Sequence, residues 1–239
     1  MRRLVAGELI KVRTTRTALG FGLAAVLLVL AGVLISILAG DPSTADDKRT
    51  ALSFGSGVST VLLLFGAVGA TGEFRHRTLA PAVLIAPDRV RLFLARVAAY
   101  ALTALLFAAF MLLVAFVVGI PLLSGRAGPG LTGGDYAEVA VGGVLATVLA
   151  AALGVAFGTL VRNQVGAVVG ILVWITILES LIGLVSSDVV DELPGVLMGR
   201  VGQGGDDQMA LAPATLLLLG WTVAFCVVAA LLDRRRDVE

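Results

Sequence analysis

The apolar residues of this chain fall into six long runs, and charged residues gather in the short segments between them. Each run has about the 20 residues that a helix needs to cross ~30 Å of hydrocarbon. A backbone in lipid has to satisfy its own hydrogen bonds, and no alternating pattern indicates a barrel, so every run is predicted to be helical. The predicted spans are residues 18–38, 51–71, 92–120, 139–161, 165–185 and 211–232.

The pattern therefore predicts an all-α, polytopic membrane protein, built as a single transmembrane domain over residues 1–239. Composition agrees, because 58% of the residues are hydrophobic and 15% are charged, against roughly 25% in ordinary soluble domains. The one cysteine, Cys226, excludes an intramolecular disulfide, and the one histidine, His76, excludes a multi-histidine metal site. We expect no bound metal and no nucleic-acid partner.

Basic residues predict the orientation of the spans, since they are enriched on the cytoplasmic side. Placing the amino terminus inside leaves four basic residues in outer segments, namely Lys48, Arg49, Arg126 and Arg200. Both termini are therefore predicted to be cytoplasmic, with the first span kept as an uncleaved anchor. The other fourteen basic residues then face the cytoplasm: Arg2, Arg3, Lys11, Arg13, Arg16, Arg75, Arg77, Arg89, Arg91, Arg96, Arg162, Arg234, Arg235 and Arg236.

The N-terminal segment is predicted to form an amphipathic helix at the membrane interface, leading into the first span. Val5, Leu9 and Val12 fall at positions i, i+4 and i+7 on one face. Glu8 and Lys11 fall on a different side, where they can pair across one helical turn.

The cytoplasmic loop between the second and third spans is predicted to contain a short helix, Leu79–Ile85. Thr78 can cap it, and Pro81 is tolerated because amides of the first turn have no helical partner. The helix must stop before Pro87, and Asp88 then caps the long helix of the third span.

The basic clusters around this helix, Arg75–Arg77 and Arg89–Arg96, have two interpretations. They can simply enforce topology and bind anionic lipid headgroups, as basic juxtamembrane segments do. Glu73 and a helix held between two prolines are not needed for topology, so a docking surface for a partner is the alternative.

Small residues recur inside two spans, at a spacing that lets helix backbones approach closely. The favoured interpretation is packing within one chain, and a dimer interface or a substrate path is the alternative. Serines of the second span, Ser53, Ser56 and Ser59, add scattered polar groups to an otherwise apolar path. In the fourth span the small residues stand at strict four-residue steps: Gly142, Ala146, Ala150, Gly154 and Gly158.

Glu179 is the only ionisable side chain well inside a predicted span, in the outer half of the fifth helix. A carboxylate at such a depth is costly and faces a cavity or a partner. Two roles are open: lining or gating an exit path, or a structural hydrogen bond to a neighbouring helix or the outer loop. That loop, 186–209, can hold a short, partly buried helix over Val189–Met198.

The loop between the second and third spans resembles the permeases of type-2 ABC exporters, which are short six-span subunits common in actinobacteria. The opening GELIKVRTTR resembles the N-terminal helix of that family, GTLVRNQVGAVVG its hairpin between the fourth and fifth spans, and WITILES its fifth span. The chain departs from the family at Arg77, where glycine is common, and at Arg96, where lysine is common. The residues of the loop that match are Glu73, Arg75, His76, Thr78, Pro87, Arg89, Arg91 and Arg96.

The resemblance implies that residues 73–85 form a cytoplasmic coupling helix that docks on a separate ATPase, with the N-terminal helix against the same partner. It also implies a second permease chain, identical or paralogous, and a location in the bacterial cytoplasmic membrane. The implied ATPase-coupling residues are Glu73, Arg75, His76, Thr78, Leu79, Val83, Glu8 and Lys11, and the implied path or gating residues are Glu179, Ser56 and Ser59.

The sequence itself favours a separate ATPase. A phosphate-binding loop needs the pattern GxxxxGK[ST], and neither of the two lysines, Lys11 and Lys48, stands in it. We therefore expect a transport subunit rather than an enzyme, with ATP and Mg²⁺ bound by the partner chain.

Three other classes remain as alternatives. An ion-coupled secondary carrier usually has several intramembrane charges and broken helices, whereas these spans offer Glu179 and no interior proline. An intramembrane enzyme needs convergent nucleophile, base or metal groups, which the spans lack. A non-transporting membrane anchor or immunity-type protein has no sequence feature that excludes it.

Overall fold

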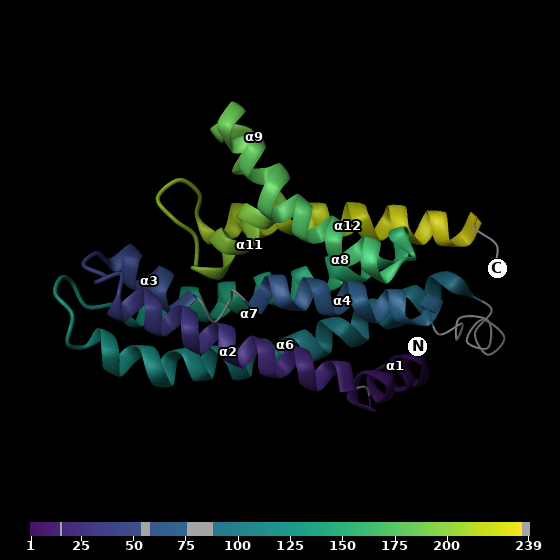
Figure 1. Ribbon diagram of the computed structural model, residues 1–239, viewed down its shortest axis with the longest axis horizontal. Coiled ribbons are helices and arrows are strands. Elements are labelled where there is room, and N and C mark those ends of the chain that lie inside the picture. The colour runs from purple at the N-terminus through teal and green to yellow at the C-terminus, as the bar shows by residue number, and fades with distance from the viewer. Residues whose placement is uncertain (15, 54–57, 76–87, 236–239) are drawn as a thin grey trace.

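The computed structural model describes residues 1–14, 16–53, 58–75 and 88–235 (Figure 1). All of its named elements are helical, which confirms the all-α prediction. They are α1 (Arg2–Thr14), α2 (Arg16–Leu38), α3 (Ala45–Ser53), α4 (Val58–Arg75), α6 (Arg89–Leu123), α7 (Gly133–Val161), α8 (Gln164–Val173), the π-helix η1 (Trp174–Leu178), α9 (Glu179–Val185), α10 (Ser187–Val190), α11 (Pro194–Gly202) and α12 (Leu211–Arg235).

Six segments of the described chain are long and apolar enough to cross a membrane, which confirms the predicted number of spans. They are α2, α3 with α4, α6, α7, the continuous α8–η1–α9, and α12. The helix α1 and the end of α12 lie at the same end of the bundle, which we call the terminal end (Figure 1). We call the other end, which carries α3 and the start of α7, the distal end.

The centre of the bundle is formed by α4 and α7. Of the most apolar 18-residue stretch of the α3–α4 segment, 79% is buried inside the protein, and the corresponding share for α7 is 61%. The other four spans are between 11% and 33% buried, so they surround this central pair. The fully buried side chains Leu62 of α4 and Val155 of α7 belong to the core between them.

The outer faces of the surrounding spans are covered with large apolar side chains. Leu19 of α2 is 77% exposed, Leu106 of α6 is 72% exposed and Leu184 of α9 is 83% exposed. Soluble proteins do not expose contiguous apolar surface on this scale, because its transfer from water is what drives folding. These faces are therefore suited to contact with lipid.

The second predicted span, residues 51–71, is wrong in its bounds. The structure has two helices, α3 and α4, on either side of residues 54–57, and α4 continues to Arg75. The start of α3 before the apolar run has a local cause. Oγ1 of Thr44 accepts a 3.1 Å hydrogen bond from the amide of Asp47, and Oδ2 of Asp47 accepts a 3.0 Å bond from the amide of Thr44.

The third span also differs from its prediction. Asp88 caps α6 as expected, since Oδ1 accepts a 3.1 Å hydrogen bond from the amide of Arg91, but the helix begins at Arg89. It then runs through Pro121 to Leu123, so the prediction of no proline inside a span is wrong. A proline in the last turn is tolerated because it removes only one hydrogen bond near a helix end.

The predicted outer helix Val189–Met198 is replaced by two shorter helices, α10 and α11. The break comes at Pro194, which occupies the first position of α11, where the missing amide has no helical partner. α11 is apolar and packs on α7 and α12, with Leu197 and Val201 fully buried. The outer segment therefore contains a short helix, α11, that packs into the bundle.

Candidate functional site

At the terminal end, α1 lies against the start of α6, and a buried charge pair joins the two helices. Glu8 is 5% exposed and Arg96 is 3% exposed. Oε2 of Glu8 lies 4.0 Å from Nε of Arg96, and Oε1 of Glu8 accepts a 2.6 Å hydrogen bond from Nζ of Lys11. Lys11 stays half exposed. Lys11 therefore stays accessible at the surface of α1, while Glu8 makes its contacts within the chain.

The predicted Glu8–Lys11 pair is thus present, but the prediction that Glu8 falls on a different side of α1 from Val12 is wrong. The buried residues of α1 are Glu8 and Val12, one turn apart. The pattern of α1 alone places Glu8 with the polar residues, because its partner Arg96 comes from another helix. Because Glu8 pairs with Arg96 of α6, the side of α1 that carries Glu8 is buried rather than exposed.

A second anchor at the terminal end is Asp233, which sequence reasoning missed. Its Oδ1 accepts a 2.9 Å hydrogen bond from Nη2 of Arg162, which ends α7. Its backbone carbonyl accepts a 3.1 Å bond from Nη1 of Arg89, the first residue of α6. Asp233 therefore ties three helices together. The available signal was an acid directly before the three arginines 234–236.

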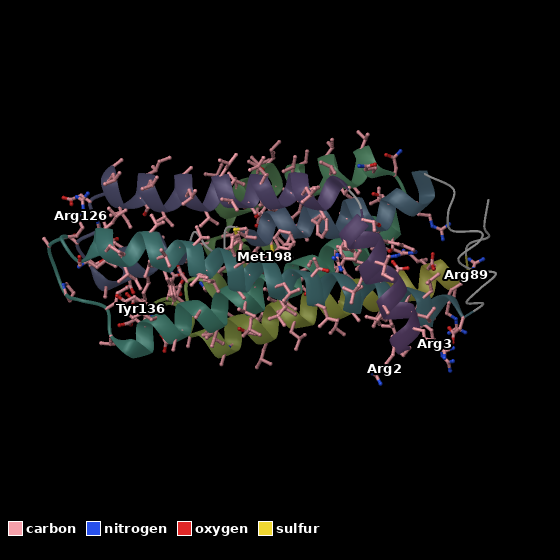
Figure 2. All side chains as sticks on the ribbon, turned by 90° about the horizontal axis from the view of Figure 1, so that it is seen from below. Arg2, Arg3, Arg89, Arg126, Tyr136 and Met198 are labelled. Carbon is pink, nitrogen blue, oxygen red and sulfur yellow. The ribbon has the colours of Figure 1, made fainter. Side chains whose placement is uncertain are left out.

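The other predicted coupling residues are only partly within the described chain. The backbone of Glu73 and Arg75 lies in the last turn of α4 rather than in a loop. Residues His76, Thr78, Leu79 and Val83 lie outside the described residues, as does the predicted helix Leu79–Ile85. The structure describes the two helices that flank that segment, namely the end of α4 and the start of α6. Figure 2 labels Arg89, the first residue of α6.

Figure 2 shows the distribution of arginine along the bundle. Arg2, Arg3 and Arg89 lie at the terminal end, and Arg126 lies at the distal end. Arg126 is paired there, since Nη1 donates a 2.8 Å hydrogen bond to Oδ1 of Asp41.

The small residues of α7 form its contacts with α4 and α11. A Cβ added at Gly154 would overlap the carbonyl oxygen of Leu63 in α4, and one at Gly142 would overlap the carbonyl oxygen of Val201 in α11. Close approach of two backbones is the property for which small residues are selected. The remaining members of the stripe, Ala146, Ala150 and Gly158, are also buried, and Gly158 faces Ala67 of α4.

Ser59 belongs to this same α4–α7 contact. It is 2% exposed, and its hydroxyl lies 3.3 Å from the hydroxyl of the fully buried Thr147. Ser56 lies outside the described residues. Within one chain Ser59 therefore lies at a helix–helix interface, and its role in a substrate path stays a prediction.

Glu179 is 3% exposed, and three donors surround its carboxylate. The indole N–H of Trp174 donates to Oε1 at 2.8 Å, the amide of Gly195 donates to Oε1 at 2.9 Å, and the amide of Val196 donates to Oε2 at 3.1 Å. Gly195 and Val196 are the second and third residues of α11, whose first-turn amides lack helical partners. A carboxylate on one span therefore caps the N-terminus of the inserted helix.

The π-helix explains how Trp174 and Glu179 come together. Residues five apart lie on different faces of an α-helix, whereas one wide π-turn brings them to nearly the same face. The amide of Glu179 accordingly donates to the carbonyl of Trp174. These hydrogen bonds fit the structural role that the sequence left open for Glu179. A gating role for Glu179 stays a prediction.

The distal end is held by charged side chains that are largely withdrawn from solvent. Lys48 is 2% exposed, and its Nζ donates a 3.0 Å hydrogen bond to the carbonyl of Pro129. Arg49 of α3 pairs with Asp135 and, at 2.8 Å, with Glu138 in the first turns of α7. The acids thus also lie at the N-terminus of α7, where the helix dipole favours negative charge.

Arg200 fixes the C-terminal end of α11. It is 6% exposed, and its guanidinium donates to Oδ2 of Asp206 at 2.6 Å, to Oδ1 of Asp191 at 3.2 Å and to Oε1 of Gln208 at 2.8 Å. Burial alone would raise the pKa of Asp206, but the hydrogen bonds from Arg200 and from the amides of Met209 and Gln208 lower it below its ordinary value.

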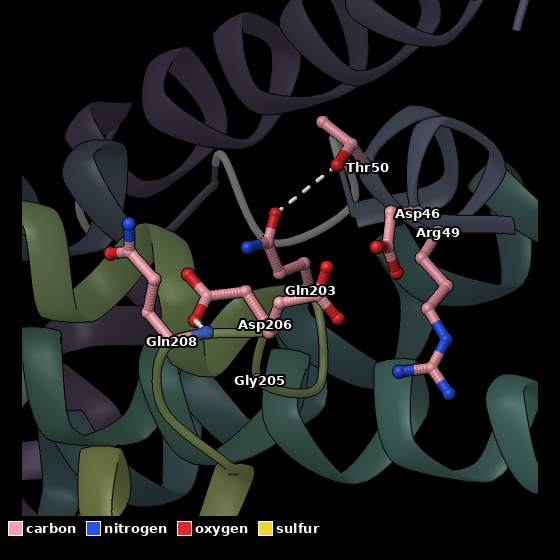
Figure 3. Close-up of a pocket in the computed structure, with 8 residues that line it drawn as sticks. Asp46, Arg49, Thr50, Gln203, Gly205, Asp206 and Gln208 are labelled. Atoms are coloured by element: carbon pink, nitrogen blue, oxygen red, sulfur yellow. Dashed lines mark hydrogen bonds between the residues drawn. The ribbon is translucent and has the colours of Figure 1, made fainter. Parts of the chain in front are cut away.

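A polar hollow of about 290 Å³ lies between α3 and the segment that follows α11 (Figure 3). Oγ1 of Thr50 donates a 3.2 Å hydrogen bond to Oε1 of Gln203 across it. Its acids include Asp46 and Asp207, but among the described residues no group of three His, Cys, Asp or Glu side chains could hold a metal ion. The hollow is open to the distal surface and has no feature that selects a ligand.

The polar contacts of the described chain therefore gather at three places. These are the α1–α6 and Asp233 anchors at the terminal end, the Glu179 cap within the bundle, and the contacts of Lys48, Arg49 and Arg200 at the distal end. No protein-family model matches the chain, and no curated protein matches its sequence.

Proposed function

We propose that this chain is the membrane-spanning permease subunit of an ATP-driven exporter in the bacterial cytoplasmic membrane. ATP and Mg²⁺ are bound by a separate ATPase chain, and two permease chains associate with two ATPase subunits. The terminal end faces the cytoplasm in this proposal, because most of the basic residues of the described chain lie there, Arg2, Arg3 and Arg89 among them.

The observation that carries the proposal is the attachment of α1 to α6. α1 contacts α6 through the buried Glu8–Arg96 pair, close to the start of α6, which follows the segment that resembles a coupling helix. A push on that segment or on α1 thereby reaches α6 directly. Arg89 and Asp233 extend the same connection to α12 and to the α7–α8 turn.

The partner is tested with the chemistry of the two lysines. Lys11 is half exposed at the terminal end, whereas Lys48 is buried at the distal end. An amine-reactive cross-linker applied to native membranes should join Lys11 to a chain with nucleotide-hydrolysing activity. Lys11→Arg is the matched control, because it keeps the charge and the N-terminal amine but removes the reactive side chain.

Coupling is tested in reconstituted vesicles that contain the permease and the captured ATPase. Glu73→Ala and Arg75→Ala should leave ATP hydrolysis in place and abolish export, because the force no longer reaches the spans. Arg126→Ala, at the distal end, should leave both activities unchanged. Normal export by the first two variants contradicts the proposed coupling.

The same preparation separates the alternatives. Transport by the purified chain alone, driven by an ion gradient, assigns it to the secondary carriers. A chain that captures no ATPase and moves no substrate under either driving force is a membrane anchor or immunity-type protein.

A further inference from the structure

An apolar cavity of about 100 Å³ lies inside the bundle, next to the Glu179 cap, from which Trp174 lines it. α4 and α7 form its floor, with Leu63 and Phe157, and α11 closes one end with Met198. Trp174 of the π-helix stands on one side and Phe225 of α12 on the other. The cavity is therefore a wedge between the fifth and sixth spans.

The wedge exists because the fifth and sixth spans pack on α4 and α7 rather than closely on each other. The rings of Phe157 and Phe225, with centroids 6.4 Å apart, mark its inner wall. Trp174, Ile175 and Phe225 are only half buried, so the wedge opens sideways, between η1 and α12, toward the outside of the bundle.

Water is a poor occupant of this cavity. All nine lining side chains are apolar apart from the indole N–H of Trp174, which already donates to Glu179. A buried water needs two to four polar partners, and apolar cavities of about 150 Å³ stay dry and bind apolar molecules instead. The occupant must therefore be a hydrocarbon.

The position of the mouth decides which hydrocarbon. Seven of the nine lining residues belong to candidate membrane spans, and the other two, Pro194 and Met198, belong to the helix α11 inserted between them. At such a position the surrounding medium is the acyl chains of the bilayer. An acyl chain is thin and flexible enough to enter a narrow lateral opening.

We propose that this cavity binds one acyl chain of a bilayer phospholipid, which enters between η1 and α12. The acyl chain makes dispersion contacts with the apolar side chains that line the wedge. It thereby attaches the fifth span to the rest of the bundle. Protein alone buries only 11% of the most apolar 18-residue stretch of that span. This site is independent of whether the chain is a transporter.

The two tryptophans allow a direct test. Trp174 lines the cavity, whereas Trp221 of α12 does not and donates instead to the carbonyl of Glu192 at 2.8 Å. The full-length Trp221→Phe variant in detergent is titrated with a phospholipid brominated in its acyl chains, which quenches tryptophan on contact. Quenching of Trp174 should saturate at one phospholipid per chain. In the matched Trp174→Phe variant, Trp221 meets the cavity only through the ring of Phe225, 6.1 Å away, so its quenching at the same phospholipid concentration should be clearly weaker.

Filling the cavity should remove the saturable quenching. Leu153→Phe fills it from the floor, and Ile175→Phe narrows the mouth from a half-buried position that tolerates a larger ring. Both are made in the Trp221→Phe chain, so that if the first does not fold the second still decides. Saturable quenching that persists in the folded filled variants overturns the proposal. So does quenching that disappears when the chain dimerises, which assigns the cavity to a side chain of a second copy.

Discussion

The fourth span, α7, and the fifth, α8–η1–α9, are almost equally apolar but occupy opposite positions in the molecule. Their mean hydropathies are 2.3 and 2.4. Yet 61% of the most apolar 18-residue stretch of α7 is buried, against only 11% of the corresponding stretch of α8–η1–α9. Hydropathy therefore identifies both as spans but does not say which one lies at the centre. Figure 1 shows the consequence, with α9 projecting away from the bundle.

Residue size explains the difference. α7 presents glycine and alanine to α4 and α11, so their backbones approach closely and many atoms come into contact. In lipid, association between helices rests on such packing, because apolar surface gains little by leaving the acyl chains. α9 presents Leu181, Leu184 and Val185, which are 53%, 83% and 89% exposed and suit lipid instead.

The fifth span is held by different means. Its strongest directional contacts with the bundle are the hydrogen bonds from α11 to Glu179, supplemented by the apolar contacts of α8 with α4. One span is thus fixed by the shape of its small residues, and the other by one carboxylate. Variants of each should fail in different ways.

The largest effect is expected for Gly154→Ala in α7. The added methyl group overlaps the carbonyl oxygen of Leu63, which is backbone and cannot move aside. Overpacking of this kind costs about 3 kcal/mol in the free energy of unfolding. Reversible unfolding in mixed detergent micelles measures that loss.

Gly220→Ala in α12 is the matched control, because a Cβ at Gly220 meets nothing within 4 Å. Alanine is the better helix former by about 1 kcal/mol, so this variant should be unchanged or slightly more stable. Equal destabilisation by the two substitutions would show that α4 and α7 do not approach as closely as the structure has them.

A smaller effect is expected for Glu179→Ala. It leaves the amides of Gly195 and Val196 without their acceptor in an apolar setting, at a cost of about 2 kcal/mol. Glu179→Gln keeps one acceptor oxygen and should lose about half as much. Hydrogen exchange at these two amides should speed up most in the alanine variant.

Ser180→Ala tests whether that loss belongs to the cap. Ser180 is the next residue, is exposed and bonds only within its own helix, at 2.9 Å to the carbonyl of Thr176. Its replacement should change the free energy of unfolding by less than about 0.5 kcal/mol. Slow exchange of the Gly195 amide in Glu179→Ala would refute the capping role.

What the sequence predicts well is local. The six apolar runs, the cap of α6 by Asp88 and the Glu8–Lys11 pair depend on residues close together in the chain, and all are present in the structure. The stripe from Gly142 to Gly158 likewise marked α7 as a closely packed helix, although not which helices it would meet.

What the sequence does not predict depends on partners far along the chain. Glu8 is turned inward by Arg96, and Asp233 is held by Arg162, so neither position follows from its own helix. The N-terminus of α11 is capped by Glu179, which comes from a separate element, α9. The predicted helix Val189–Met198 ran across Pro194, and the carboxylate that accepts from the amide of Gly195 lies 16 residues before that glycine.

The smallest effect concerns the other end of α11 and depends on pH. Asp206 has a pKa below its ordinary value of 3.8, with burial opposing and the hydrogen bonds from Arg200 and two amides favouring the charged form. Its contribution to stability is therefore complete above pH 3.8 and is lost as the pH falls through the lower pKa of the folded state. Such a partly exposed ion pair contributes about 0.5–1 kcal/mol.

Comparison with Asp206→Asn isolates this contribution from the other acids. The difference in free energy of unfolding between the two proteins should be constant near neutral pH and should shrink below pH 3.8, as the native carboxylate takes up its proton. A difference that grows on acidification would mean that Asp206 is held in its protonated form. In that case Arg200 would fix α11 through Asp191 and Gln208, and the inserted helix would be insensitive to acid at this end.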